Sequence, residues 1–136
     1  MSIIYTQGTF DLFHVGHLNL LKRCSVLGTV IVSLLTDEAI EKYRGKPPII
    51  TYEDREDLLM ACKYVDAVIP LDDVAKTQNQ IRASRPEFVV LGSDWAKKDI
   101  YKQYQMSREE LDPLLIFFPY TQGISSTLIK EKVKAQ

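Results

Sequence analysis

The sequence has only two cysteines, no excess of cationic residues and no long apolar run. Cys24 and Cys62 form neither a metal-binding pair nor a disulfide-dense pattern, so we expect both to be reduced thiols. A net charge of −1 gives no reason to expect nucleic acid or an anionic membrane surface as a partner. Because no apolar run approaches the roughly 18 residues that a membrane helix needs, the sequence predicts no membrane span.

The amino-terminal residues also lack the basic and apolar regions of a secretory leader. We therefore expect the protein in the cytoplasm. The chain has 136 residues, of which 46% are hydrophobic. That is enough for one folded domain spanning residues 1–136 and too little for two domains of ordinary size.

Short apolar runs alternate with longer segments of helical character along the chain. We predict strands at residues 2–7, 29–35, 66–70, 87–92 and 114–119, and helices at 15–27, 52–65, 75–85, 107–111 and 126–136. Thr51, with Asp54 three residues later, is expected to cap the helix that begins at residue 52. This alternation is typical of an α/β fold. We expect a single Rossmann-like domain, with a five-stranded parallel sheet and helices on both faces.

The unusual residues of the chain follow the ends of the predicted strands. "GTFDLFHVGH" (8–17) follows the first strand, "TDE" (36–38) the second, "GSDW" (92–95) the fourth and "YTQGISST" (120–127) the fifth. Ligands of parallel α/β sheets bind beyond the carboxyl ends of the strands. The sequence therefore predicts that these loops meet in one binding site.

Both histidines of the protein lie in the first of these loops. His14 and His17 are three residues apart at the start of a predicted helix, so their imidazoles can share one face of it. A helix amino terminus attracts anions. Gly16 leaves room for a phosphate to approach, and Gly8 permits a sharp turn after the strand. We interpret this loop as a phosphate-binding site.

A metal site is the main alternative for the same loop. His-x-x-His can chelate a cation, and Asp11 is the one nearby residue that could supply a third ligand. Two other nucleotide sites are disfavoured, because no G-x-G-x-x-G follows the first strand and no P-loop sequence is present.

Two segments resemble a known superfamily. "GTFDLFHVGH" resembles the H-x-G-H signature of the nucleotidyltransferases, and "ISSTLIK" (124–130) resembles their second signature. Through "YEDREDLL", "KYVDAVIP" and "GSDW", the chain most resembles the glycerol-3-phosphate cytidylyltransferases, in family order and over almost its whole length. The resemblance implies a cytoplasmic homodimer that uses CTP with Mg²⁺. It would convert a small phosphorylated alcohol into a CDP-alcohol and release pyrophosphate.

The resemblance also implies roles for individual residues. His14 and His17 would hold the CTP phosphates, and Ser126 and Thr127 would grip the β- and γ-phosphates. Asp11 would either orient a histidine or lysine or bind Mg²⁺. The implied nucleotide-binding residues are Gly8, Thr9, Phe10, Asp11, Gly16, Gly92, Asp94, Trp95, Tyr120, Thr121, Ile124, Ser125, Ser126 and Thr127.

Further groups would serve catalysis and the acceptor. Arg55 matches the family arginine of "YEDR" and would face the phosphates across the cleft. Lys46, in the Gly-Pro loop at 44–50, would be a second catalytic cation that contacts substrate phosphate, and Asp37 would help to orient the acceptor. Tyr120 stands where the family commonly has an arginine. The tyrosine keeps a hydroxyl donor and loses a permanent charge.

Three hypotheses follow. The first is a CTP-dependent cytidylyltransferase acting on a small phosphorylated alcohol, with glycerol 3-phosphate as the expected acceptor. The second is an adenylyltransferase that uses ATP on a phosphorylated small molecule. The third is a catalytically impaired nucleotide-binding subunit, which only Tyr120 suggests.

Overall fold

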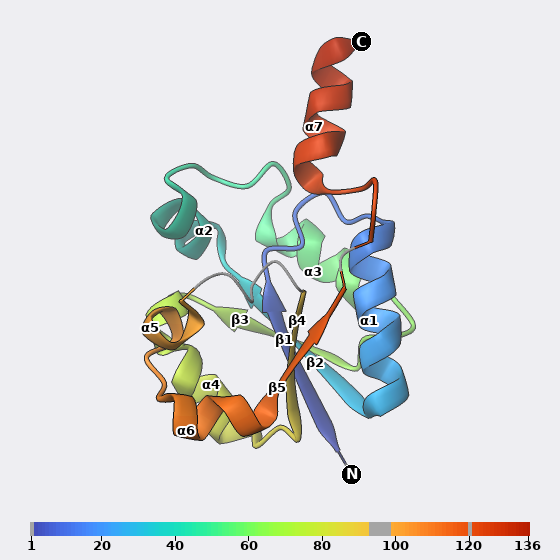
Figure 1. The fold of residues 1–136 in the computed structure, drawn as a ribbon. Helices are drawn as coiled ribbons and strands as arrows, with labels where there is room; N and C mark the ends of the chain where they lie inside the picture. The colour runs from blue at the N-terminus through green and yellow to red at the C-terminus, as the bar shows by residue number, and fades with distance from the viewer. Residues whose placement is uncertain (1, 93–98, 120) are drawn as a thin grey trace.

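The computed structural model describes residues 2–92, 99–119 and 121–136. Five parallel strands form one sheet in the order β3-β2-β1-β4-β5 (Figure 1). The strands are β1 (Ile3–Gly8), β2 (Thr29–Leu35), β3 (Ala67–Leu71), β4 (Phe88–Gly92) and β5 (Leu115–Phe118). The first three strands build outward from β1 in one direction, and β4 returns to its other side. The switch point of the sheet therefore lies between β1 and β4.

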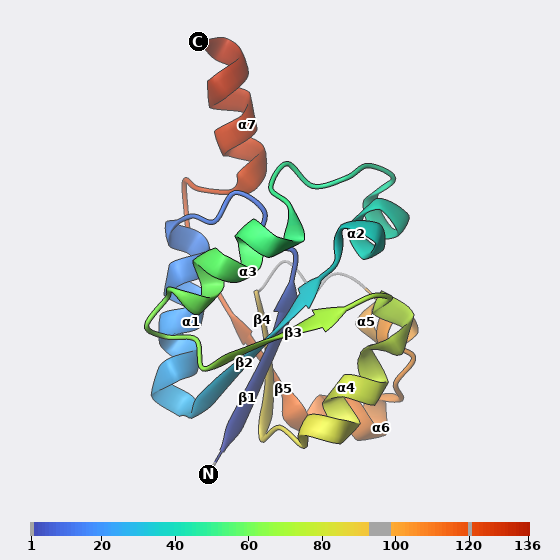
Figure 2. The ribbon, with the colours of Figure 1, turned by 180° about the vertical axis from the view of Figure 1, so that it is seen from behind.

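Helices cover both faces of the sheet (Figures 1 and 2). Helices α1 (Val15–Leu27) and α3 (Tyr52–Met60) pack on one face, and α4 (Thr77–Ser84), α5 (Ile100–Tyr104) and α6 (Arg108–Leu111) on the other. Helix α2 (Asp37–Arg44) lies beside the carboxyl end of β2, and α7 (Ser126–Ala135) projects beyond the sheet. This arrangement confirms the predicted single Rossmann-like α/β fold.

The side chains of β1 divide between the two faces with the period of a strand. Ile4 packs with Leu21 and Cys24 of α1, whereas Tyr5 packs with Ile81 of α4 and Tyr104 of α5. All six side chains are at most 2% exposed. The sheet is therefore buried on both faces, which is why its central strands are nearly continuous apolar runs.

The predicted helices differ from the structure in three places. Helices α2 and α5 were not predicted, because both are short and polar and lack an extended apolar stripe. Their starts are nevertheless capped by side chains, with Thr36 accepting from the Ala39 amide and Asp99 from the Lys102 amide. Helix α3 ends at Met60 rather than at residue 65, and Thr51 precedes it without a side-chain capping bond.

Two other expectations bear on the described residues. Cys24 and Cys62 are free thiols, as predicted. Among the residues that the structure describes, none of the helices combines the length and the apolar character that crossing a lipid bilayer requires.

Candidate active site

A cavity of about 350 Å³ opens where β1, β4 and β5 end. This volume lies within the range of small-ligand sites. The predicted site residues that line it are Gly8, Thr9, Phe10, His14, Gly16, His17, Gly92, Thr121, Ile124, Ser125, Ser126 and Thr127. The structure thus brings together the loops after the first and fifth strands and the end of the fourth strand, at Gly92. Asp94, Trp95 and Tyr120 lie outside the described residues.

The loop from β1 to α1 contains two residues in the left-handed conformation, which its sequence did not predict. Phe10 and Leu12 have positive φ angles of 48° and 52°, which are uncommon for residues other than glycine. Phe10 is 4% exposed, and its ring lies 5.1 Å from the imidazole of His17. Packing of this aromatic ring into the core holds the strained turn in place.

The two histidines cap the amino terminus of α1 with their own rings. His14 Nδ1 accepts a hydrogen bond from the Gly16 amide at 3.0 Å, and His17 Nδ1 accepts one from the His14 amide at 3.2 Å. The two imidazoles stack with their centroids 3.9 Å apart. Two of the unpaired amides at the helix start are satisfied in this way.

These bonds fix the tautomer of each ring. A backbone amide can only donate, so each Nδ1 must carry a lone pair, and the proton of the neutral ring must sit on Nε2. Both imidazoles line the cavity. The pair therefore offers two Nε2–H donors to an anionic ligand.

Burial keeps the histidine pair neutral. It lowers the pKa of His17 to about 3, with repulsion from His14 as a second cause and the Asp11 carboxylate opposing the shift. Burial also lowers the pKa of His14. At neutral pH the site thus holds two hydrogen-bond donors rather than two fixed charges.

Gly16 is required by the histidine cap. A Cβ atom at this position would lie 2.7 Å from Cε1 and 2.9 Å from Nδ1 of His14. Any side chain would therefore displace the imidazole that the Gly16 amide holds.

The amino terminus of α7 faces the same cavity. Ser125 precedes the helix and accepts a hydrogen bond from the Leu128 amide at 3.1 Å, so it is the capping residue. Ser126 donates to the Asp11 carbonyl at 2.7 Å and thereby ties α7 to the first loop. The unpaired amides of this helix end suit the oxygens of a phosphate.

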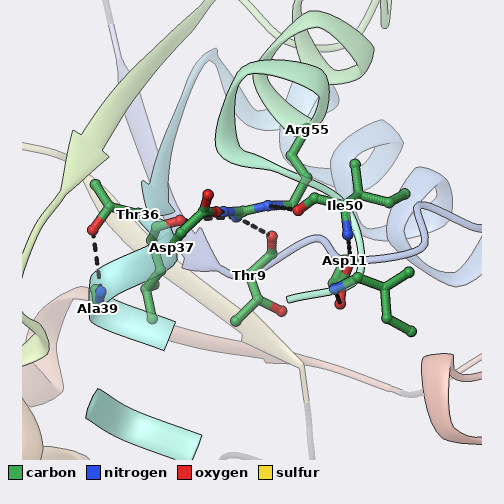
Figure 3. A network of polar contacts seen from close by, with 9 residues as sticks. Thr9, Asp11, Thr36, Asp37, Ala39, Ile50 and Arg55 are labelled. Carbon is green, nitrogen blue, oxygen red and sulfur yellow. Dashed lines mark hydrogen bonds and ion pairs between the residues drawn. The ribbon is translucent and has the colours of Figure 1, made fainter. Parts of the chain in front are cut away.

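Asp11 binds the backbone of the loop before α3 and does not line the cavity. Its carboxylate is 1% exposed, and its two oxygens accept the amides of Ile49 and Ile50, each at 2.9 Å (Figure 3). With both oxygens engaged and no contact with the cavity, Asp11 does not fit the role of a Mg²⁺ ligand. Among the described residues there is also no group of three histidine, cysteine or acidic side chains that could hold a metal.

The structure does not bring Arg55 to the cavity. Its side chain is fully buried, and it donates to the carbonyls of Thr9, Leu35 and Ile50 and to the carboxylate of Asp37, at 2.8–2.9 Å (Figure 3). The guanidinium thus joins the loop after β1, strand β2, helix α2 and the loop before α3. In this arrangement Arg55 positions the loops around the site, and Asp37 is its partner rather than a cavity-lining group.

The cation that reaches the cavity from this region is Arg44. The described lining includes Arg44 but not Lys46, although both fall in the segment 44–50 that the sequence predicted to be one loop. Arg44 ends α2, and its Nη2 donates to Thr9 Oγ1 at 3.2 Å. The unpredicted helix α2 is the reason for this difference, because it directs residue 44 toward the first loop.

Other lining residues also escaped the sequence patterns. Asn19 and Arg23 are one helical turn apart on α1. Asn19 donates to Thr121 Oγ1 at 3.1 Å, and Arg23 lies over the ring of Phe118, 5.4 Å from its centroid. The spacing of four on one helix face was the available signal. Gln7 is a further lining residue, at the end of β1.

Comparison with known proteins gives a consistent set of relatives. Residues 5–132 match the family model described as "Cytidylyltransferase-like". Glycerol-3-phosphate cytidylyltransferase of Bacillus spizizenii is 37% identical over 133 residues, covering 96% of each chain. That of Bacillus subtilis is 32% identical over 133 residues, covering 98% of each. The bifunctional protein HldE of Helicobacter pylori is 31% identical over 135 residues, which are 98% of this chain and 28% of that protein.

Solved structures share the fold at lower identity. A lipopolysaccharide core biosynthesis protein from Thermoplasma volcanium superposes with a TM-score of 0.69 at 23% identity, covering 89% of this chain and 97% of that one. TmcAL of Thermotoga maritima, bound with α-thio ATP, has a TM-score of 0.68 at 15% identity and covers 99% of this chain and 50% of that one. At these identities the likeness concerns the architecture alone.

Proposed function

Since the chain belongs to the cytidylyltransferase-like family of nucleotidyltransferases, we propose that it transfers CMP from CTP to a small phosphorylated alcohol, with glycerol 3-phosphate as the first candidate. The products are a CDP-alcohol and pyrophosphate. The observation that carries the proposal is the histidine pair, whose Nδ1 atoms are engaged by backbone amides and whose Nε2–H groups remain for phosphate oxygens.

The proposed step is a direct displacement at phosphorus. A phosphate oxygen of the acceptor forms a bond to the α-phosphorus of CTP, and the bond from that phosphorus to the bridging oxygen breaks. Pyrophosphate leaves with the electron pair. Negative charge grows on the leaving group, so donors that are already oriented lower the barrier without reorganising. His14, His17 and the amino terminus of α7 are the groups placed for this role.

Arg44 adds positive charge at the edge of the cavity. Its hydrogen bond to Thr9 holds the guanidinium against the first loop. We propose that it binds the acceptor phosphate, in the role that the sequence pattern gave to Lys46. A guanidinium can bind a phosphate through two parallel hydrogen bonds. Mg²⁺ would enter with the triphosphate as part of the substrate, since Asp11 is not available to it.

A panel of substrates tests the proposal. Purified protein is mixed with Mg²⁺, one of the four nucleoside triphosphates and glycerol 3-phosphate, and pyrophosphate release is measured. We expect release with CTP to exceed release with ATP, because the loops after β4 and β5 are expected to leave a slot for a pyrimidine. Release with ATP equal to or above that with CTP would favour the adenylyltransferase hypothesis. If none of the four nucleotides gave pyrophosphate release, the result would favour an impaired nucleotide-binding subunit.

We also propose that the protein is a homodimer. Leu58 and Met60 of α3 are 45% and 50% exposed, and β3 is an edge strand of the sheet. Apolar side chains beside an unpaired strand edge suit a contact with a second copy. Such a dimer would have the two-fold symmetry that is commonest among oligomers.

A further inference from the structure

Gln7 is a buried polar residue of the cavity that the proposed chemistry does not use. It lies near the carboxyl end of β1, is 8% exposed and lines the cavity. By the alternation of a strand it shares a face of the sheet with Tyr5, whose ring packs against α4 and α5. The histidines stand on α1, on the opposite face. The cavity therefore extends over the carboxyl end of the sheet, from the face covered by α1 to the face covered by α4 and α5.

The hydroxyl of Tyr5 determines which way the Gln7 amide points. The distance from Tyr5 Oη to Gln7 Oε1 is 2.6 Å, which suits O–H···O and is short for N–H···O. Gln80 Oε1 lies farther from the hydroxyl, at 3.1 Å, and already accepts the proton of Ser33. Because burial raises the pKa of Tyr5, its hydroxyl keeps the proton that it donates.

This orientation leaves the Gln7 Nε2 group as a donor. Within residues 2–92, 99–119 and 121–136, no hydrogen bond from Nε2 to the protein is present. The other lining groups on this side are largely apolar and include Leu91, Tyr104 and Val74, which belong to the same core as Tyr5. An amide in such surroundings is costly unless an oxygen in the cavity, from water or from a ligand, accepts its hydrogen bond, and a ligand that displaces the water must replace that bond.

The geometry of the displacement assigns this side of the cavity to the acceptor. In phosphoryl-type transfers the attacking and leaving oxygens are roughly in line, on opposite sides of the phosphorus. Ser126 and Thr127, at the start of α7, are placed for the leaving pyrophosphate. The acceptor must then enter from the side of α2 and α5, with its phosphate at Arg44 and its organic part toward Gln7.

We propose that Gln7 is a specificity-determining residue, whose amide donates a hydrogen bond to a hydroxyl on the organic part of the acceptor. This inference rests on the proposed function. The acceptor class is then a hydroxylated alkyl phosphate rather than a plain one. Tyr5 acts through Gln7 as a positioning residue, because it holds the Oε1 atom and so directs Nε2 to the cavity.

The experiment compares two acceptors that differ only in their hydroxyl groups. With CTP and Mg²⁺, kcat/KM is measured for glycerol 3-phosphate and for propyl phosphate in the same protein preparation. Their ratio does not depend on the fraction of active protein, so a partly unfolded variant remains interpretable. We expect the ratio to fall about fivefold in Gln7→Met, the loss of one neutral hydrogen bond of about 1 kcal/mol. Tyr5→Phe should lower it by a smaller factor.

The matched control is Gln103→Met. Gln103 is a half-buried glutamine of α5 that does not line the cavity, so this variant should keep the wild-type ratio. An unchanged ratio in Gln7→Met, or a wild-type protein that does not prefer glycerol 3-phosphate, overturns the assignment while the proposed function stands. A wild-type protein that releases no pyrophosphate with either acceptor overturns the proposed function itself, and this assignment with it.

Discussion

Replacement of Arg55 by methionine separates a structural role from a catalytic one. The side chain is fully buried and makes four hydrogen bonds, three to backbone carbonyls and one to Asp37. Methionine fills a similar volume but leaves these acceptors without donors. Removing one partner of a buried ion pair costs about 3–5 kcal/mol, and the 38% exposure of Asp37 places the expected loss toward the lower end. That is a large share of a typical domain stability of about 5–15 kcal/mol.

Urea unfolding followed by circular dichroism measures this loss. The control is Arg82→Met, which removes an arginine that pairs with Glu110 where both side chains are more than one-third exposed. We expect the control to leave the unfolding free energy nearly unchanged, because exposed ion pairs contribute little. Pyrophosphate release by the same preparations, scaled to the folded fraction, gives the catalytic effect. If Arg55→Met kept its stability within about 1 kcal/mol and still lost turnover, the guanidinium would act on phosphate and our structural interpretation would be refuted.

Three further predictions follow from the site and the surface. His14→Ala and His17→Ala should each lower kcat by about 100-fold, because each removes a donor that stabilises the transition state. The effect on CTP binding should be smaller. Near-normal turnover in either variant would show that its histidine does not bind the phosphates. Burial lowers the pKa of His17 from the ordinary 6.5 to about 3, so as the pH falls the unfolded chain binds this proton before the folded protein does. The free energy of unfolding of the wild type should therefore fall relative to that of His17→Gln below about pH 6.5. Urea titrations should show a difference of up to about 2 kcal/mol at pH 5. Parallel pH profiles for the two proteins would contradict the burial argument. Sedimentation at micromolar concentration should give a dimer, and Leu58→Glu should shift it toward the monomer; a wild-type monomer throughout would rule the dimer out.

Much of the fold follows from local patterns in the sequence. Apolar runs of strand length alternating with amphipathic segments predict a parallel sheet, because a strand buried on both faces needs apolar side chains at nearly every position. The convergence of the loops also follows, since the carboxyl ends of parallel strands lie at one edge. The presence of His14 and His17 at this edge follows on the same grounds, and both line the cavity. The short polar helices α2 and α5 carried too little periodicity to be predicted.

The tertiary structure alone decided which charged side chains reach the cavity. Arg55 and Asp11 match the pattern of site residues, yet each binds backbone groups about 40 positions away in the chain and is buried there. Arg44, which no motif singled out, reaches the cavity because α2 carries it to Thr9. A sequence motif specifies that a charge is present, whereas the partner of that charge depends on segments that meet only after folding. Burial without a partner is costly, so the donors and acceptors brought together by the fold determine where each buried charge points.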